Sequence, residues 1–143
     1  MKFATVDLQH IIESNEHFQD LRKQSQNAEQ KIRLEEEHKQ NDLQKKEVAL
    51  TKKRNTLSSQ ALQKELDQLN QEKEKMREEH NTRIRKLELD YLHMLEEAKQ
   101  KVTETLKIIA KEKNYIAIFD RSTLIYSDLD NINELIISRL NQT

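Results

Sequence analysis

The chain contains no glycine and no proline among its 143 residues. Folded domains use these two residue types for tight turns, left-handed backbone positions and the ends of strands. A chain without them is expected to make few turns and long, uninterrupted helices. The same absence excludes glycine-rich phosphate loops and G-x-S-x-G nucleophile turns, and the absence of cysteine excludes disulfides, thiolate zinc sites and cysteine nucleophiles.

Composition narrows the fold class further. Charged residues make up 36% of the chain and hydrophobic residues 34%, so a large compact core is not expected. A net charge of −1 leaves little self-repulsion to keep the chain unfolded. No stretch approaches the ~18 consecutive apolar residues of a membrane-spanning helix, and the N-terminus lacks the pattern of a signal peptide. If the protein is exported, we expect that peptide to have been removed before the first residue.

Apolar side chains recur at helical spacing between residues 16 and 113, in a region rich in Glu, Lys and Gln. Narrow stripes of this kind are typical of helices paired in a coiled coil. A Ser/Thr-rich stretch near the middle favours a turn and a helix start. We therefore predict a long antiparallel, coiled-coil-like helical hairpin, or arm, over 16–113 with its tip near 56–60. The stripe, which is interrupted at Lys73 and His80, consists of Phe18, Leu21, Ser25, Ala28, Ile32, Leu43, Leu50, Leu57, Leu62, Leu66, Leu69, Met76, Ile84, Leu87, Tyr91, Met94, Ala98, Val102, Leu106 and Ile109.

The two ends of the chain, residues 1–15 and 114–143, are expected to fold together into one small αβ body. The alternation in 2–7 predicts a strand, and the spacing in 8–15 predicts one or two helical turns. The run at 115–119 is apolar on both faces and therefore predicts a buried central strand. The fold class is thus mainly α with a small β body.

The remaining elements of this body follow from shorter signals. Asn114 can adopt the left-handed conformation that ends a helix. Residues 123–126 predict a further strand and 127–131 a polar connection. Asn133 is the expected N-cap of a last helix, flanked by a hydrophobic staple. The apolar face of that helix would be formed by Leu135, Ile136 and Leu140.

A body this small, with one or two short strands per side, is not expected to form a stable core by itself. The apolar residues of its central strand and last helix are too many for one small body to cover. Oligomerisation would bury them. The predicted oligomer core consists of Phe3, Val6, Ile116, Ile118, Phe119, Ile136 and Leu140.

Basic residues gather near the predicted tip, whereas the body is acidic. One interpretation is the solvated end of a coiled coil, and the other is contact with an anionic partner such as a membrane surface or an acidic chain. Nucleic acid is disfavoured because the tip has no aromatic side chain on which bases could stack. The residues of this basic tip are Lys45, Lys46, Lys52, Lys53 and Arg54.

The sequence contains no arrangement that predicts catalysis, a cofactor or a metal site. No two histidines are spaced as metal ligands on one helix, and no H-E-x-x-H motif occurs. The segment 128–134 resembles the start of a calcium loop, but Ile132 and Asn133 stand where a ligand and a glycine are required. We therefore expect no enzyme activity, because no nucleophile and base are brought together in a predicted pocket.

Three segments resemble one protein family. The opening FATVDLQHII at 3–12, the stretch KNYIAIFDRSTLIY at 113–126 and the ending INELIISRLN at 132–141 are similar to the corresponding segments of the periplasmic chaperones called Skp or OmpH-like. The resemblance covers the whole chain in order. It implies a homotrimer with a β-rich trimerisation body and three helical arms, which enclose a cavity for unfolded outer-membrane proteins and work without ATP. It also implies a periplasmic location and a cleaved signal peptide.

A second function class remains open at this point. A structural coiled-coil or adaptor protein, including a prefoldin-like cytosolic chaperone, would share the paired helices. Prefoldin-type chains place free helix ends at the tips and strands at the connecting end, which is the reverse of the loop tip predicted here.

Overall fold

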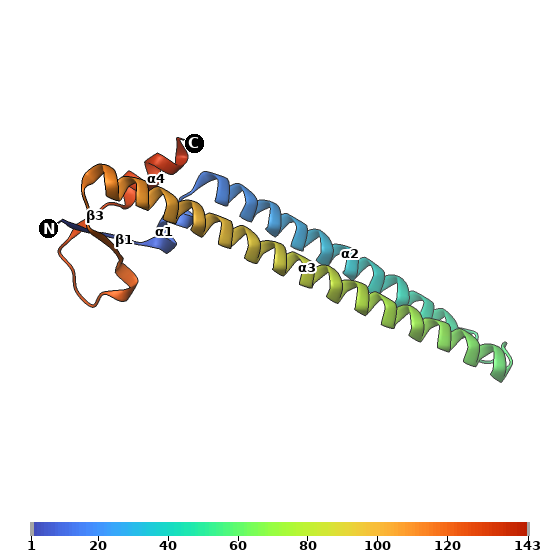
Figure 1. The fold of residues 1–143 in the computed structure, drawn as a ribbon. Coiled ribbons are helices and arrows are strands. Elements are labelled where there is room, and N and C mark those ends of the chain that lie inside the picture. The colour runs from blue at the N-terminus through green and yellow to red at the C-terminus, as the bar shows by residue number, and fades with distance from the viewer. Residues whose placement is uncertain (1, 143) are drawn as a thin grey trace. The chain divides into compact units, whose positions relative to one another are not determined.

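A computed structural model describes residues 2–142 of the chain (Figure 1). Two compact units can be recognised. The first, here called the body unit, takes the chain up to Gln24 and again from Asp90 onward, and the second, called the arm unit, is Ser25–Leu89. The elements in order are β1 (Phe3–Val6), α1 (Leu8–Glu13), α2 (Glu16–Lys52), α3 (Ser59–Lys113), β2 (Ala117–Asp120), the short 3-10 helix η1 (Arg121–Thr123), β3 (Asp130–Asn131) and α4 (Asn133–Asn141).

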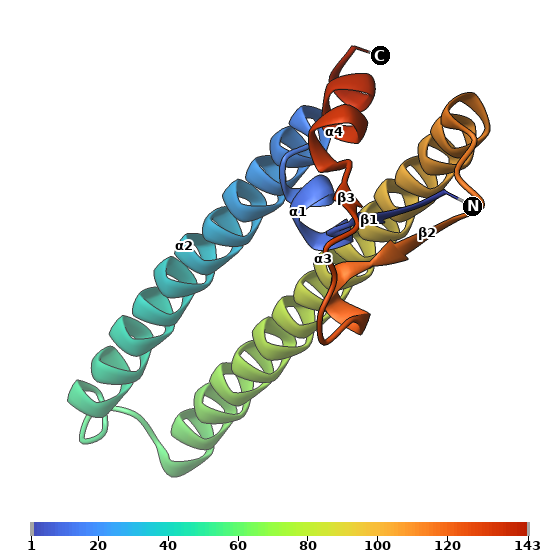
Figure 2. The same cartoon turned by 90° about the vertical axis from the view of Figure 1, so that its left-hand side faces the viewer.

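The body unit contains a three-stranded parallel sheet in the order β2-β1-β3 (Figure 2). The predicted N-terminal strand and the helical turns after it are confirmed as β1 and α1. The apolar run at 115–119 does contribute a strand, but its predicted central position is wrong. β2 lies at an edge, and β1 is the central strand, with Ala4, Thr5 and Val6 buried.

The strand predicted at 123–126 is also wrong. Its first residue, Thr123, belongs to η1, and residues 124–126 form neither helix nor strand. At the start of η1, Asp120 Oδ1 accepts a hydrogen bond from Ser122 N at 3.3 Å and turns the chain away from the line of β2. The third strand is β3, which lies in the predicted polar connection. Ile132 N donates to the carbonyl of Thr5 at 3.0 Å, and Thr5 Oγ1 donates to the carbonyl of Asp130 at 3.3 Å. Pairing with the central strand therefore outweighs the low strand propensity of an Asp-Asn pair.

The last helix exists, but its predicted cap is wrong. The N-cap position of α4 is Ile132, which makes no side-chain capping bond. Asn133 is instead the first helical residue, and its Oδ1 accepts a hydrogen bond from Asp7 N at 2.7 Å. The asparagine side chain therefore ties the end of β1 to the start of α4. The sequence could not reveal this long-range partner.

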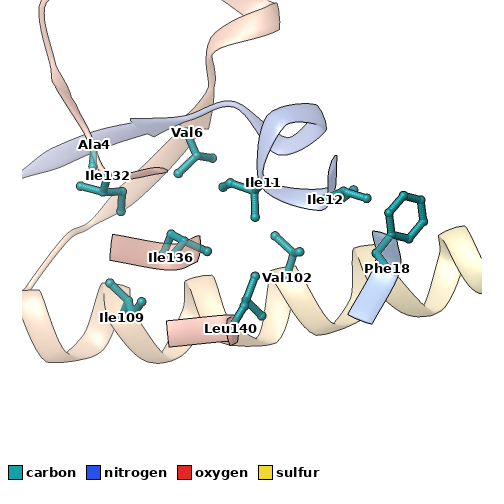
Figure 3. Close-up of a cluster of buried hydrophobic side chains, with 10 residues drawn as sticks. All are labelled: Ala4, Val6, Ile11, Ile12, Phe18, Val102, Ile109, Ile132, Ile136 and Leu140. Carbon is teal, nitrogen blue, oxygen red and sulfur yellow. The ribbon is translucent and has the colours of Figure 1, made fainter. Parts of the chain in front are cut away.

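The core of the body unit is built by β1, α1, α4 and the portions of α2 and α3 that belong to this unit (Figure 3). Asn114 ends α3 with a backbone φ of 61°, which confirms the predicted left-handed position. The chain can therefore turn from α3 into β2 without glycine. The buried core residues are Ala4, Val6, Ile11, Ile12, Phe18, Val102, Ile109, Ile132, Ile136 and Leu140.

The arm unit consists of the facing antiparallel segments of α2 and α3. The loop between them covers residues 53–58, where Ser58 Oγ accepts a hydrogen bond from Ala61 N at 3.2 Å and so caps α3. The predicted apolar stripe is confirmed in this unit. Its buried members are Ile32, Leu43, Leu50 and Leu69.

Candidate functional site

The most conspicuous surface of the body unit is the exposed edge of its sheet. β2 pairs with β1 on one side only within the described chain, and the chain beyond it carries apolar side chains in solvent. An exposed apolar edge is a template for pairing with another chain. We call residues 116–129 the edge segment. Its exposed large apolar residues are Ile116 (61% exposed), Phe119 (40%), Ile125 (107%), Tyr126 (81%) and Leu129 (40%).

The N-terminal strand holds the edge segment at its start. Ile116 N donates to the carbonyl of Lys2 at 2.8 Å, and Lys2 Nζ lies 4.8 Å from the centroid of the Tyr115 ring. The rings of Phe3 and Phe119 lie 6.0 Å apart between centroids. β2 is therefore held in a defined position beside β1 although its outer side has no strand partner within residues 2–142.

The structure divides the seven residues of the predicted oligomer core into two groups. Val6, Ile136 and Leu140 are buried within a single chain and need no second copy to cover them, whereas Leu135 on the same helix is 36% exposed. α4 packs on α1 and β1, which the sequence pattern could not show. The other four residues are half-buried or exposed near β2, namely Phe3, Ile116, Ile118 and Phe119.

Polar contacts fasten α4 to both long helices inside the body unit. Arg139 donates two hydrogen bonds to the carboxylate of Glu112, at 3.1 and 2.9 Å. The hydrogen bond from Arg139 lowers the pKa of Glu112, and the same bond raises the pKa of Arg139. Two residues further along, at the last residue of α4, Asn141 Oδ1 accepts from Glu16 N at 3.1 Å and thereby satisfies a free donor at the start of α2. Sequence reasoning missed these contacts because no local signal marks a partner so distant in the chain.

A small cavity of about 170 Å³ lies within the body unit beside these contacts. Its walls are mostly apolar and come from four helices. A cavity of roughly 150 Å³ with apolar walls can hold one benzene-sized group, so this space is large enough for a single apolar side chain. The lining residues are Ile12, Asn15, His17, Phe18, Leu21, Met94, Glu97, Ala98, Lys101, Val102 and Leu140.

The basic tip lies in the arm unit at and beside the loop. Lys52 ends α2, and Lys53 and Arg54 lie in the loop. Lys46 is paired with Glu72, at 2.9 Å between Nζ and Oε2. The other four tip residues are exposed and form no ion pair within residues 2–142. Their charges are therefore available to an external anion.

Within the described part of the chain, no group of three or more His, Asp or Glu residues is placed to hold a metal ion. Across the same residues, none of the helices is apolar over a length that would cross a membrane. Three candidate binding features have been described: the apolar edge segment, the small cavity and the basic tip.

Comparison with known proteins identifies the family of the chain. The family model described as "Outer membrane protein (OmpH-like)" matches residues 2–140. The chain belongs to the OmpH-like family. The resemblance of the three sequence segments is thereby confirmed. Among curated proteins, none matches the sequence significantly.

A solved structure supports the fold of this OmpH-like chain. It is the crystal structure described as that of an OmpH-like outer membrane chaperone from Caulobacter crescentus CB15. The TM-score is 0.90 over 98% of this chain and 83% of that chain, at 13% sequence identity. At this identity the likeness shows the fold alone, which is the mainly helical α+β hairpin fold.

Proposed function

We propose that this OmpH-like protein is an ATP-independent holdase chaperone, which binds unfolded outer-membrane proteins in a cavity between the arms of a homotrimer. The observation that carries the proposal is the family match over residues 2–140, because the OmpH-like family supports a chaperone role and is not a family of enzymes. The description of the Caulobacter protein as an outer membrane chaperone agrees with it. Family membership favours this function over a structural coiled coil, an adaptor or a prefoldin-like cytosolic chaperone.

The trimer in this proposal is assembled through the body unit. The edge segment supports it, because an apolar strand edge is stabilised when another chain pairs with it. In this assembly Phe3, Ile116, Ile118 and Phe119 contact a second copy, while Val6, Ile136 and Leu140 form the layer beneath. Ile125 and Tyr126, which are fully or almost fully exposed in one chain, would be covered as well.

The proposed location is the periplasm, which is where the OmpH-like family acts. We propose that the protein reaches it with a signal peptide that is then removed. We also propose that the basic tip contacts an anionic membrane surface, because four of its five cations have no ion-pair partner within residues 2–142.

The holdase activity is tested by light scattering. An unfolded transmembrane β-barrel protein is diluted from denaturant into buffer with and without an excess of the assembled protein. We expect scattering to be suppressed without ATP, because client binding relies on many weak contacts and not on a nucleotide cycle. A matched Glu78→Gln variant, changed at an exposed arm position, should suppress scattering as well as the unmodified protein. Precipitation of the client in the presence of excess protein, or a requirement for ATP, contradicts the proposal.

A further inference from the structure

The middle of the arm unit contains a stretch in which neither helix buries an apolar side chain. None of residues 33–42 of α2 or 77–86 of α3 is buried. The large apolar residues there are Leu34, which is 57% exposed, and Ile84, which is half-buried. On α2, buried seam residues resume immediately on either side, at Ile32 and Leu43. The apolar seam is therefore interrupted within one unit of the structure.

Ion pairs join the two helices across this interruption. The closest pair joins Glu35 to Arg83. The hydrogen bond from Arg83 lowers the pKa of Glu35, so this pair is charged at neutral pH. His80 occupies one of the two stripe positions at which the sequence pattern lacks an apolar residue, and Lys73 occupies the other. The ion pairs are Glu35 Oε2 with Arg83 Nη1 at 2.7 Å and Lys39 Nζ with Glu79 Oε2 at 3.9 Å. In addition, His80 Nδ1 lies 2.8 Å from Glu36 Oε2, a contact that is ionic only when the histidine is protonated.

The next stretch toward the loop provides an internal comparison. It also has ion pairs between the helices, Lys46 with Glu72 and Glu47 with Lys73. There, however, the charges accompany an apolar cluster. That cluster consists of the buried Leu43, Leu50 and Leu69 with the half-buried Leu66 and Met76. Charge thus supplements apolar packing near the loop and replaces it in the middle of the unit.

We propose that residues 33–42 and 77–86 form an ionic latch. In this stretch α2 and α3 are held to each other by charge, and they separate locally when the charges are screened, while each remains helical. Screening acts over a Debye length of about 10 Å at 0.1 M salt and about 3 Å at 1 M. Apolar packing is not weakened by added salt in this way. Salt should therefore open the latch and leave the apolar stretch closed.

The latch is a property of the arm unit and does not depend on the chaperone function. An opened latch would release the carboxylates of Glu35 and Glu36 and the guanidinium of Arg83 for contact with charged groups of another molecule. The arm would then widen at a defined place in response to its ionic surroundings. A helical hairpin with an unbroken apolar seam has no such place.

Distances between spin labels test the proposal directly, because the chain contains no cysteine of its own. One pair of labels is placed at Glu37→Cys and Glu78→Cys, across the latch, at exposed positions that form no ion pair among the described residues. The control pair is Gln44→Cys and Gln71→Cys, which lies one heptad nearer the loop on both helices. Doubly labelled full-length chain is mixed into an excess of unlabelled chain, so that only distances within one chain are measured.

Between about 0.05 M and about 1 M salt we expect the distance distribution of the latch pair to broaden and shift to longer values, while that of the control pair stays unchanged. Helicity measured by circular dichroism should stay constant. The proposal is overturned if the latch pair is insensitive to salt, if both pairs broaden equally, or if the change is a loss of helix.

Charge substitutions give a second test at low salt. Arg83→Glu places like charges together and should shift the latch pair as far as high salt does. Adding Glu35→Arg should restore the original distance, because the pair is re-formed with its signs exchanged. Arg85→Glu, at an exposed position on the same helix with no ion pair in the described chain, should have no effect. Failure of the double exchange to restore the distance would overturn the role assigned to this pair.

Discussion

Substitutions of two isoleucines, one buried and one exposed, can distinguish effects on the folding of the body unit from effects on its proposed assembly. Ile136 is completely buried, and Ile125 is completely exposed in the single chain. Ile136→Ala removes core packing and should lower the free energy of unfolding by about 2–5 kcal/mol. Ile125→Ala removes no contact within the chain. If the edge segment packs on a second copy, Ile125→Ala should weaken association by up to about 1.5–3 kcal/mol per chain, which raises the dissociation constant about tenfold to a hundredfold.

Sedimentation velocity and thermal unfolding, each measured over a range of protein concentrations, distinguish these effects. The melting temperature of the unmodified protein should rise with concentration, because association stabilises the folded state by mass action. Ile125→Ala should move dissociation to higher concentration, whereas Ile136→Ala should lower the melting temperature at every concentration. A folded monomer near 17.1 kDa, with melting independent of concentration and unchanged by Ile125→Ala, would refute the reasoning.

Three further results are expected. The pKa of Glu112 is lowered in the folded state, so its pair with Arg139 stabilises the protein at pH values above the unfolded pKa of a glutamate, and this contribution is lost as pH falls through the lowered value. Glu112→Gln should therefore reduce stability at neutral pH and make the loss of stability in acid less steep, as measured by urea unfolding at several pH values. Asn133→Ala leaves the N–H group of Asp7 without its acceptor and should cost about 0.5–1.5 kcal/mol in the same assay. The control is the exposed Asn70→Ala within α3, which should not destabilise, because alanine favours helix more than asparagine does. Replacement of the whole basic tip by glutamine should leave helicity unchanged and weaken salt-dependent binding to vesicles of anionic lipid, and equal binding by both proteins would contradict a role for these charges.

The sequence predicted those parts of the fold that depend on local chemistry or on a long repeat. The seam residues are an example, since a heptad stripe identifies the buried face of a helix whatever the partner is. Asn114 is another, because a left-handed helix end in a chain without glycine is most easily made by asparagine. The Ser/Thr-rich stretch placed the predicted tip near 56–60, and the loop lies slightly earlier, at 53–58, with Ser58 capping α3.

The sequence could not predict features that are decided by distant partners. The stretch 123–126 has high strand propensity but remains outside the sheet. Asp130 and Asn131 have low strand propensity but pair with Ala4 and Thr5 of β1. The basic tip and the predicted oligomer core differ in the same way. The charges of the tip are visible in the sequence, but the burial of Ile136 and Leu140 within one chain depends on how α4 packs.

The different bases of stability in the two units lead to a final prediction. The body unit is held by a contiguous apolar core, while the arm unit has four buried apolar residues and a polar interruption. Amides in β1 and α4 should therefore exchange hydrogen more slowly than those of the arm unit, because they open only when the contiguous core opens. Amides in 33–42 should exchange faster than those in 43–50, and added salt should accelerate the first group more than the second. If salt accelerated exchange equally along all of α2, the interruption at Glu35 and Glu36 would have no energetic consequence, and the helix would open as one unit.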